Sequence, residues 1–335
     1  MKSRPVNDQF LTLPRKRRFR RSLLAWYDQH HRNLPWRTNR DPYRIWLSEI
    51  MLQQTRVAAV IEHYHEFLRR FPTVEKLASA REASVLAAWS GLGYYRRARM
   101  MHAAAKIIAR EYAGSFPTTE GSLRKLPGIG RYTAAAIASI AYNEPVAVVD
   151  GNVERVLRRI SGRQLDGEIL WSTANLLLEP KRPGDFNQAM MELGAVVCTP
   201  RSPQCLTCPV VELCATRGEL ASIARAASQK KREIHYSLSI RGGDREDRQI
   251  FLVRRQLSES LMPGMWELPE SAIPNGANSP VFSVRHSITV TDYKVRVWMD
   301  APITRIAGKW ISVNQLKKVA LTGLARKILR RAEIF

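Results

Sequence analysis

The chain has 335 residues, of which 45% are apolar and eight are tryptophan, so it can form folded cores and is not an intrinsically disordered chain. Lysine and arginine number 53 against 30 acidic residues, which gives a formal net charge of +23. A field of that sign attracts polyanions and releases counterions on contact, so nucleic acid is the predicted partner. A basic tail on an ordinary enzyme, a ribosomal protein and a membrane-surface protein are the alternatives.

The first two thirds of the chain predict helices almost throughout. Residues 1–18, which end in the basic run at 15–18, are expected to form a disordered tail. From Phe19 to Cys198 apolar residues recur every three or four positions, the period of an amphipathic helix, and Thr73 suits an N-cap. The expected later helices span 83–90, 96–112, 119–125, 131–142, 152–160, 171–178 and 186–197.

The pattern changes after the last cysteine. Residues 221–234 carry small and basic residues without an apolar face, which is typical of a linker. Strand patterns follow at 234–240, 249–254, 281–284, 287–299 and 309–311, and 316–332 predicts a closing helix. Residues 235–335 are therefore expected to form a separate α/β domain.

All four cysteines lie close together, at Cys198, Cys205, Cys208 and Cys214, with the spacing C-x6-C-x2-C-x5-C. Thiolates this close favour a soft metal centre, either an iron–sulfur cluster or zinc. Common zinc knuckles use two C-x2-C pairs and this chain has one, so the spacing favours the cluster. Two disulfides are the other alternative. The sequence has no signal peptide or long apolar run, so we expect a soluble, intracellular protein with reduced thiols.

A glycine turn and an aspartate each stand before a predicted helix. In LPGIG (126–130), Gly128 and Gly130 let backbone N–H groups approach an anion at the helix start, although G-x-G is also an ordinary connection between helices. Asp150 stands just before the helix at 152–160, where it suits an N-cap. We expect such a capping carboxylate to keep a low pKa and to remain anionic.

A single carboxylate, Glu49, lies inside the strongly apolar helix of WLSEIMLQQT (46–55). A solvent-exposed helix face is the ordinary interpretation of such a residue. Burial would instead raise its pKa and make it a proton donor near neutral pH. The uncharged hydrogen-bonding groups at 53–55 suit contacts to base edges.

Several motifs occur in one order along the chain: SEIMLQQT (48–55), GLGYY (91–95), LPGIG (126–130), VDGNV (149–153), FNQAMM (186–191) and the four cysteines. In this order they resemble the MutY-type adenine DNA glycosylases of the helix-hairpin-helix base-excision superfamily. The resemblance covers residues 20–220, and 253–255 with 264–269 resemble the family's Nudix-like C-terminal domain, without the glutamates of a Nudix catalytic box.

The resemblance implies a mainly α fold with two lobes and a C-terminal α/β domain. The helical glycosylase domain would occupy 19–220, with a six-helix module at about 40–145 and an iron–sulfur module made of 19–39 and 146–220. Residues 235–335 would form a Nudix-like domain that reads 8-oxoguanine and does not hydrolyse nucleotides.

The resemblance also implies roles for individual residues. Glu49 would protonate adenine N7, and Asp150 would stabilise or covalently capture the oxocarbenium-like sugar. Tyr132 and Asn152 would position these carboxylates and the sugar. The adenine pocket would be lined by Arg37, Leu52 and Gln188, and the opposite 8-oxoguanine would be met by Gln54, Thr55, Tyr94 and Thr289. DNA would be bound by Gly128, Gly130, Arg131 and Arg201, the last in a basic loop shaped by a [4Fe–4S] cluster on the four cysteines.

One position separates this chain from related enzymes. Endonuclease III-like enzymes carry a lysine just after the hairpin that forms a Schiff base and cleaves the strand, whereas this chain has Tyr132. A monofunctional glycosylase is implied. Thymine-mismatch glycosylases also have tyrosine at this position. Glu49 and the C-terminal domain must therefore determine the preference for adenine.

The chain departs from the family's pattern at two places. Glu154 stands where members often have a lysine, and it adds negative charge near the expected DNA face. In the reader loop Thr289 can replace a serine hydroxyl, but Val290 cannot make the hydrogen bonds of the family's histidine. We therefore expect weaker 8-oxoguanine selection than is usual for the family.

The function that this sequence favours is removal of adenine opposite 8-oxoguanine or guanine in double-stranded DNA. A thymine or pyrimidine mismatch glycosylase and a non-catalytic DNA-binding scaffold are the alternatives. We expect a monomer without membrane contact, located in the cytoplasm and, in a bacterium, with the nucleoid.

Overall fold

The computed structural model describes residues 12–219, 230–243, 247–259, 261–272, 279–288, 291–303 and 307–334. The chain forms two compact units, one of Met1–Tyr64 with Ile107–Ile223 and the other of His65–Lys106 with Ala224–Phe335. The second unit therefore joins a helical segment to the strand-rich C-terminal segment, a grouping that the sequence did not predict.

The first unit is helical and carries most of the predicted motifs. Its elements are α1 (Leu13–His30), η1 (Pro35–Arg37), α2 (Pro42–Leu52), α7 (Glu120–Leu123), α8 (Arg131–Tyr142), α9 (Gly151–Ser161), α10 (Gly167–Leu177), α11 (Pro183–Val196), η2 (Cys205–Thr207) and η3 (Val211–Leu213). Two more helices, α3 (Val57–Arg70) and α6 (Arg96–Glu111), cross the boundary between the units.

Local signals account for several of these helix ends. The Asp41 carboxylate accepts a hydrogen bond from Tyr43 N at 2.9 Å and so caps α2, with Pro42 in the first turn. Gly128 has a φ of 77°, a left-handed conformation that suits glycine, and it turns the chain into α8. Gly162, at φ 66°, ends α9 in the same conformation.

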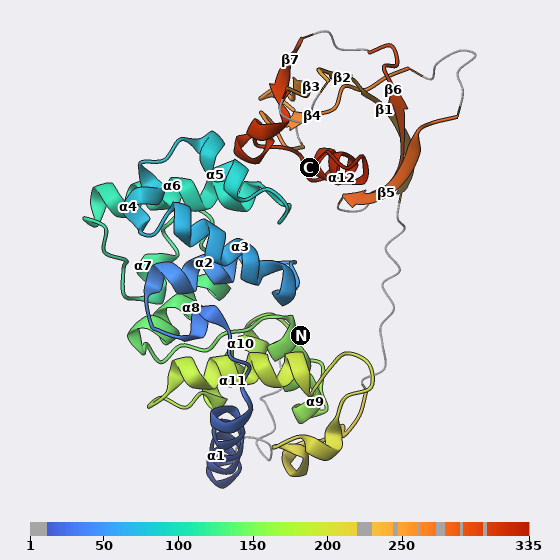
Figure 1. Cartoon of the computed structure of the whole chain (residues 1–335). Coiled ribbons are helices and arrows are strands. Elements are labelled where there is room, and N and C mark those ends of the chain that lie inside the picture. Colours follow the sequence, from blue (N-terminus) through green and yellow to red (C-terminus); the bar gives the residue numbers. More distant parts are fainter. Residues whose placement is uncertain are drawn as a thin grey trace, which may run out of the picture. The chain divides into compact units, whose positions relative to one another are not determined.

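Helix α11 is central to the packing of the first unit, because it contacts α1, α8 and α9 (Figure 1). Its buried apolar side chains, such as Phe186 and Leu193, join those of α1 and α9 in one core. A Cβ on Gly194 would lie only 2.6 Å from the Cβ of Asn152. Glycine at this position therefore lets α11 approach the start of α9, where Asp150 and Asn152 lie.

The predicted disordered tail at 1–18 is wrong for residues 13–18, since α1 begins at Leu13. Pro14 lies in the first turn, where its fixed φ suits a helix start. The helix is held by a buried stripe that includes Phe19, Leu23 and Tyr27, while the basic side chains at 15–18 are mostly exposed. Residues 1–11 lie outside the described residues.

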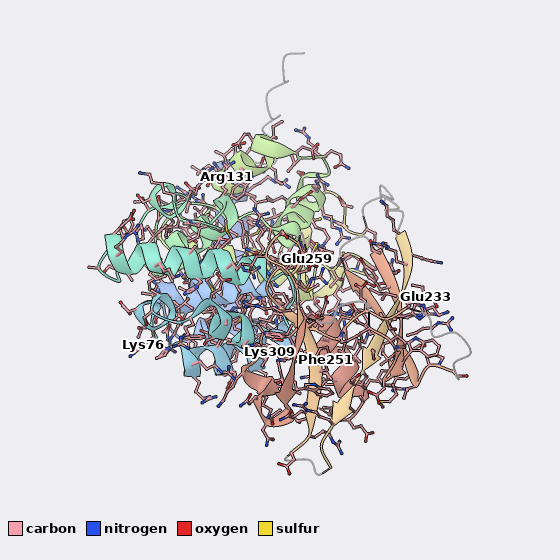
Figure 2. The ribbon with its side chains drawn as sticks, turned by 90° about the horizontal axis from the view of Figure 1, so that it is seen from above. Lys76, Arg131, Glu233, Phe251, Glu259 and Lys309 are labelled. Atoms are coloured by element: carbon pink, nitrogen blue, oxygen red, sulfur yellow. The ribbon has the colours of Figure 1, made fainter. Side chains whose placement is uncertain are left out.

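The second unit combines helices with two sheets. Its elements are α4 (Val74–Ala78), α5 (Glu82–Ala88), β1 (Lys230–Leu238), β2 (Ile240–Arg241), β3 (Gln249–Arg254), β4 (Trp266–Glu267), β5 (Phe282–Ile288), β6 (Thr291–Met299), β7 (Gly308–Ser312), η4 (Val313–Lys318) and α12 (Gly323–Arg331). One sheet has the order β1-β6-β5, with β1 parallel and β5 antiparallel to β6. In the other, β3 pairs with β2, β4 and β7, and the labelled residues Phe251 and Lys309 lie on neighbouring strands β3 and β7 (Figure 2).

The C-terminal segment has its own apolar core, built from strand residues such as Val295 and helix residues such as Ile328. Two predictions for it need correction. The linker expected at 221–234 is a strand from Lys230 onward, because β1 pairs in parallel with β6 from Lys230–Thr291, while 220–229 lie outside the described residues. The closing helix expected at 316–332 is interrupted, since Trp266 N donates to Ala320 O at 2.8 Å and holds the chain extended there.

Within the described part of the chain, no helix combines the length and the apolar character that crossing a membrane requires.

Candidate active site

Glu49 is buried in α2, contrary to the ordinary expectation for a helical carboxylate. Its side chain is only 6% exposed, and its neighbours Ser48, Ile50 and Met51 are buried as well. Burial raises the pKa of Glu49 to about 7, a hydrogen bond from Tyr132 opposes this shift, and the nearby carboxylate of Asp150 adds to it. Glu49 can therefore hold a proton near neutral pH, as a general acid must.

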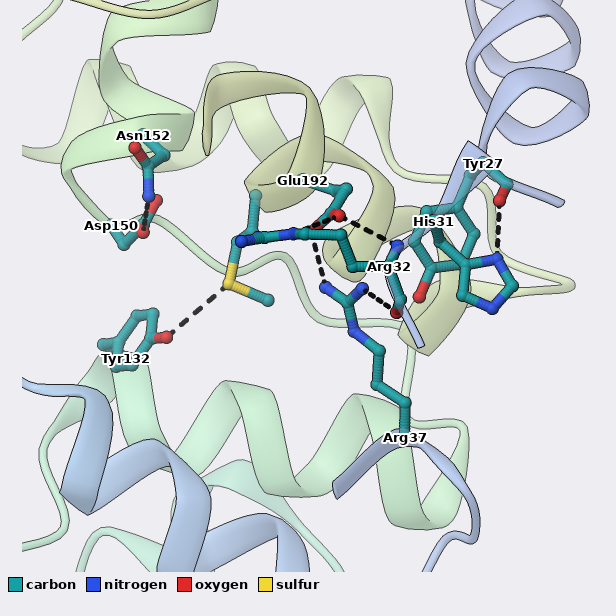
Figure 3. Close-up of polar contacts among 9 residues, drawn as sticks. Tyr27, His31, Arg32, Arg37, Tyr132, Asp150, Asn152 and Glu192 are labelled. Carbon is teal, nitrogen blue, oxygen red and sulfur yellow. Dashed lines mark hydrogen bonds and ion pairs between the residues drawn. The ribbon is translucent and has the colours of Figure 1, made fainter. Parts of the chain in front are cut away.

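Tyr132 comes from α8, two residues after the glycine turn, and its side chain contacts Glu49 of α2. Its hydroxyl donates to Glu49 Oε2 at 2.5 Å. The same hydroxyl approaches the sulfur of Met191 at 3.5 Å (Figure 3). Burial and the two neighbouring carboxylates raise the pKa of Tyr132 well above its ordinary value. The tyrosine therefore remains a neutral hydrogen-bond donor.

Asp150 caps α9, as predicted, and accepts a hydrogen bond from Val153 N at 2.7 Å. Asn152 Nδ2 donates to its second oxygen at 2.9 Å (Figure 3). The expected low pKa is wrong, because burial raises the pKa of Asp150 and outweighs these hydrogen bonds. The Asp150 carboxylate also raises the pKa of Glu49, so the two carboxyl groups belong to one site.

Arg155 connects the Asp150 turn to the cysteine loop, a link that the sequence analysis missed. Its guanidinium donates to Asn152 Oδ1 at 2.8 Å and to Gly194 O at 2.7 Å, and its Nε donates to Cys198 O at 2.8 Å. The arginine lies one helical turn after Gly151, and that spacing is the only sequence signal for its role. Glu154 forms an ion pair with Arg158 at 2.8 Å, so its charge is compensated within the protein.

A second buried carboxylate, Glu192 in α11, was also missed. It is 1% exposed and binds both Arg32 and Arg37, with Nε–Oε1 and Nη2–Oε2 distances of 2.7 Å and 2.8 Å (Figure 3). Burial raises the pKa of Glu192, but the two arginines outweigh it and hold the pKa at about 2. Like Glu49, it is flanked by apolar residues within a helix, and that pattern could have revealed it.

Arg37, predicted to line the base pocket, is thereby fixed in position. Its guanidinium also lies 5.7 Å from the centre of the Tyr27 ring, which favours a cation over the aromatic face. Of the other predicted pocket residues, Leu52 lies at the end of α2 and Gln188 in α11, and both are partly buried. Leu52 and Gln188 therefore come from the two helices that carry Glu49 and Glu192.

The residues predicted to meet the opposite base fall into both units. Gln54 and Thr55 follow α2 in the first unit, and Gln54 has a φ of 56°. Tyr94 belongs to the second unit, where it is 47% exposed. Thr289 and Val290 lie outside the described residues.

The predicted DNA-binding residues lie on the first unit. Gly128 and Gly130 form the turn before α8, and Arg201 is exposed in the cysteine loop. Arg131 is held within the protein, because it pairs with Glu168 and stacks 4.1 Å from the centre of the Trp171 ring. Its guanidinium would have to exchange the Glu168 carboxylate for a phosphate in order to bind DNA.

The four cysteines line one pocket, together with apolar side chains such as Val156 and Leu193. Arg159, which is 3% exposed, donates to Cys198 Sγ at 3.3 Å, and Arg217 N donates to Cys214 Sγ at 3.4 Å. Such N–H donors suit sulfur ligands that carry negative charge. Among the described residues no trio of His, Cys, Asp or Glu converges on a single-ion site. The donor set and its apolar surroundings fit an iron–sulfur cluster.

Comparison with protein families gives two matches. Residues 47–168 match the model of the HhH-GPD superfamily base excision DNA repair protein, and residues 198–214 match the iron–sulfur binding domain of endonuclease III. The second match confirms the cofactor that the cysteine spacing predicted, a [4Fe–4S] cluster on Cys198, Cys205, Cys208 and Cys214.

Curated relatives are named adenine DNA glycosylase. The protein of Rattus norvegicus is 51% identical over 211 residues, which cover 58% of this chain and 41% of the relative. That of Arabidopsis thaliana is 38% identical over 312 residues, which cover 78% of this chain and 49% of the relative. The chain thus spans less than half the length of these two relatives.

Among solved structures, a thermostable thymine-DNA glycosylase is 29% identical, with a TM-score of 0.57 over 60% of this chain and 96% of that one. The predicted fold class, a helix-hairpin-helix core with an iron–sulfur loop and a C-terminal segment of sheets, is confirmed. The chain therefore belongs to the HhH-GPD superfamily of base excision DNA repair proteins, as a MutY-type member that carries the iron–sulfur loop.

Proposed function

We propose that this protein is a monofunctional DNA glycosylase that removes adenine opposite 8-oxoguanine or guanine. The observation that carries the proposal is the pair of carboxyl groups of Glu49 and Asp150 in one site, where burial raises the pKa of Glu49 to about 7 and Asp150 adds to that shift. Cleavage of a purine from its sugar needs a proton on the leaving base and an anion beside the developing positive charge. These two carboxyl groups can supply one each.

In the proposed reaction, adenine is first flipped out of the duplex into the pocket beside Arg37. Glu49 gives its proton to N7 of the base, the C1′–N9 bond breaks, and its electron pair leaves with the base. Asp150 stabilises the oxocarbenium-like sugar or captures it, while Asn152 holds the carboxylate in place. Water then adds at C1′ and loses a proton, which leaves free adenine and an abasic site.

The residue at position 132 favours a reaction that ends at the abasic site, without strand cleavage. A lyase needs an amine that forms a Schiff base with the sugar. The Tyr132 hydroxyl instead donates to Glu49, and its raised pKa keeps it protonated. It would therefore orient the acid and leave the DNA strand intact.

Cys198, Cys205, Cys208 and Cys214 would hold the cluster, which would cross-link the cysteine loop when bound. Arg159 and Arg155 bond to this loop and would keep it beside the start of α9. We propose that the exposed Arg201, with the turn at Gly128 and Gly130, contacts DNA phosphates.

We further propose that residues 19–220 form the glycosylase domain and 235–335 a Nudix-like reader of 8-oxoguanine, in which Thr289 has a part. Gln54, Thr55 and Tyr94 would meet the opposite base. The working protein would be a monomer in the cytoplasm, at the nucleoid if it is bacterial.

Thymine removal is the second candidate, because a thymine-DNA glycosylase is among the similar structures. Single-turnover excision on duplexes with adenine opposite 8-oxoguanine, adenine opposite guanine and thymine opposite guanine decides between the two. We expect adenine to be released from the first two duplexes. Release of thymine alone would support the second candidate, and no excision with intact DNA binding would support a scaffold.

A further inference from the structure

The turn that carries Tyr94 has an unusual backbone. The turn is formed by residues 91–94, between α5 and α6 in the second unit, and three of its four residues have positive φ angles: Gly91 at 111°, Gly93 at 68° and Tyr94 at 46°. A left-handed conformation is unfavourable for a residue with a side chain as large as tyrosine. Neighbouring groups must therefore hold this turn in place.

Contacts from within the helical segment supply part of that support. Trp89 Nε1 donates to Gly93 O at 3.1 Å, and Arg97 Nη2 donates to Leu92 O at 3.0 Å. The Arg97 guanidinium lies 5.4 Å from the Trp89 ring centre and 5.5 Å from that of Tyr94. Trp89 is fully buried, whereas Tyr94 is 47% exposed. The exposed Tyr94 side chain is therefore attached to a turn that packs on a buried residue.

Both ends of the turn are also joined to the C-terminal segment through one carbonyl group. Ser90 Oγ, just before the turn, donates to Leu321 O at 3.1 Å, and the hydroxyl of Tyr95, just after it, donates to the same oxygen at 2.9 Å. Ser90, Tyr95 and Leu321 are 1%, 3% and 0% exposed. Because water does not compete at this buried site, these hydrogen bonds hold the two ends of the turn together.

The accepting carbonyl is itself fixed by the sheet. Leu321 lies between η4 and α12, and its neighbours bond to β4: Trp266 N donates to Ala320 O at 2.8 Å, and Thr322 N donates to Trp266 O at 2.9 Å. Arg99 Nη2 adds a second link to the C-terminal segment, with a bond of 2.5 Å to Pro263 O. The two acceptors, Leu321 O and Pro263 O, are backbone carbonyl oxygens, so a side-chain substitution at either residue does not remove them.

We propose that Ser90 and Tyr95 are positioning residues through which the C-terminal segment braces the Tyr94 turn on Leu321 O. In this arrangement the brace sets how Tyr94 meets the base opposite adenine, and so it contributes to discrimination between 8-oxoguanine and guanine. This inference rests on the proposed function. It gives the C-terminal segment an effect on base selection that is separate from any direct contact with the damaged base.

The test uses Tyr95→Phe in the full chain, which removes the donor and keeps the ring. Tyr142→Phe is the matched control, since Tyr142 donates to a different backbone oxygen, Phe116 O, at 3.3 Å in the first unit. We expect Tyr95→Phe to lower the ratio of single-turnover excision rates, 8-oxoguanine duplex over guanine duplex, by about threefold to tenfold, the loss of one buried hydrogen bond. Tyr142→Phe should leave the ratio unchanged.

A second comparison asks whether Tyr95 acts through Tyr94. In a Tyr94→Ala background, Tyr95→Phe should change the ratio no further, because the side chain that it positions is gone. Independent, multiplicative effects of the two substitutions would overturn the proposal. So would an equal loss of rate on both duplexes, or the same change of ratio in Tyr142→Phe.

Amide hydrogen exchange of the free protein separates the brace from the proposed function. Peptides that cover the Tyr94 turn should exchange faster in Tyr95→Phe and in Ser90→Ala, and at the parent rate in Tyr142→Phe. Faster exchange would support the brace even if the parent released adenine from neither duplex, a result that would refute the proposed function alone. Unchanged exchange in both variants would overturn the brace whatever the activity.

Discussion

Replacement of Glu49 by glutamine should abolish the pH dependence of excision and most of the activity, while making the protein more stable at alkaline pH. Both effects have one cause, the burial that raises the pKa of Glu49 to about 7. In the proposed reaction only the protonated carboxyl group is active. The parent's excision rate should therefore fall by about tenfold for each pH unit above 7.

The size of the effect follows from the shift. At pH 7.5 a carboxyl group with a pKa of about 7 is protonated in roughly one molecule in four, whereas at the ordinary value of 4.5 it would be protonated in roughly one in a thousand. Burial thus raises the population of the acid more than a hundredfold. Glu49→Gln keeps the shape of the side chain but has no proton to give, and it should lower the rate by roughly 10²–10⁴-fold.

The same rise in the pKa of Glu49 lowers the free energy of unfolding. Between pH 4.5 and 7 the folded protein binds more protons at Glu49 than the unfolded chain does, so the free energy of unfolding falls as pH rises through this window. Above pH 7 the full cost, on the order of 3 kcal/mol, is present. Glu49→Gln should therefore melt several degrees above the parent at pH 8 and at nearly the parent temperature at pH 4.5.

Two measurements check this reasoning. Single-turnover excision from the 8-oxoguanine duplex between pH 6 and 9 gives the activity profile, and thermal melting of both proteins at pH 4.5 and 8 gives the stability difference. Glu62→Gln, at an exposed position of α3, is the matched control and should alter neither. A parent rate that stays constant to pH 8.5, or a Glu49→Gln protein no more stable than the parent at pH 8, would refute the assignment.

Further predictions concern the groups around this carboxyl. Tyr132→Phe removes the hydrogen bond that lowers the pKa of Glu49, so the midpoint of the excision profile should move to higher pH; a midpoint that moves lower would contradict the geometry. Because Tyr132 stands in place of the lyase lysine, borohydride should trap little covalent complex between the parent and DNA, and efficient trapping would exclude a monofunctional enzyme. Glu192→Gln leaves the partly exposed Arg32 and Arg37 without their buried carboxylate and should destabilise the protein at pH 7 by about 1–3 kcal/mol, as followed by thermal melting. An unchanged melting temperature would show that these ion pairs do not support the fold. Cys208→Ser should reduce the iron and acid-labile sulfide of anaerobically purified protein and its absorption near about 400 nm, and zinc without sulfide in the parent would argue against the cluster.

Local features of this protein could be predicted from the sequence because their causes lie within a few residues. The capping role of Asp150 follows from its place directly before α9, and the bond from Val153 N spans three residues. The cysteine spacing likewise predicted the cluster from seventeen consecutive positions. Amphipathic periodicity predicted most of the helices between α5 and α11, with ends displaced by a few residues.

Properties that depend on distant contacts could not be predicted in this way. Tyr132 reaches Glu49 across 83 positions of sequence, Arg32 reaches Glu192 across 160, and Tyr95 reaches Leu321 across 226. Whether a carboxylate is buried, and which groups then oppose or reinforce its burial, sets its pKa. The sequence therefore identified Glu49 and Asp150 as acids of the site, but only the tertiary structure added Glu192. It also decided that Asp150 has a raised pKa and Glu192 a lowered one, because each pKa is the balance between desolvation and partners brought together by folding.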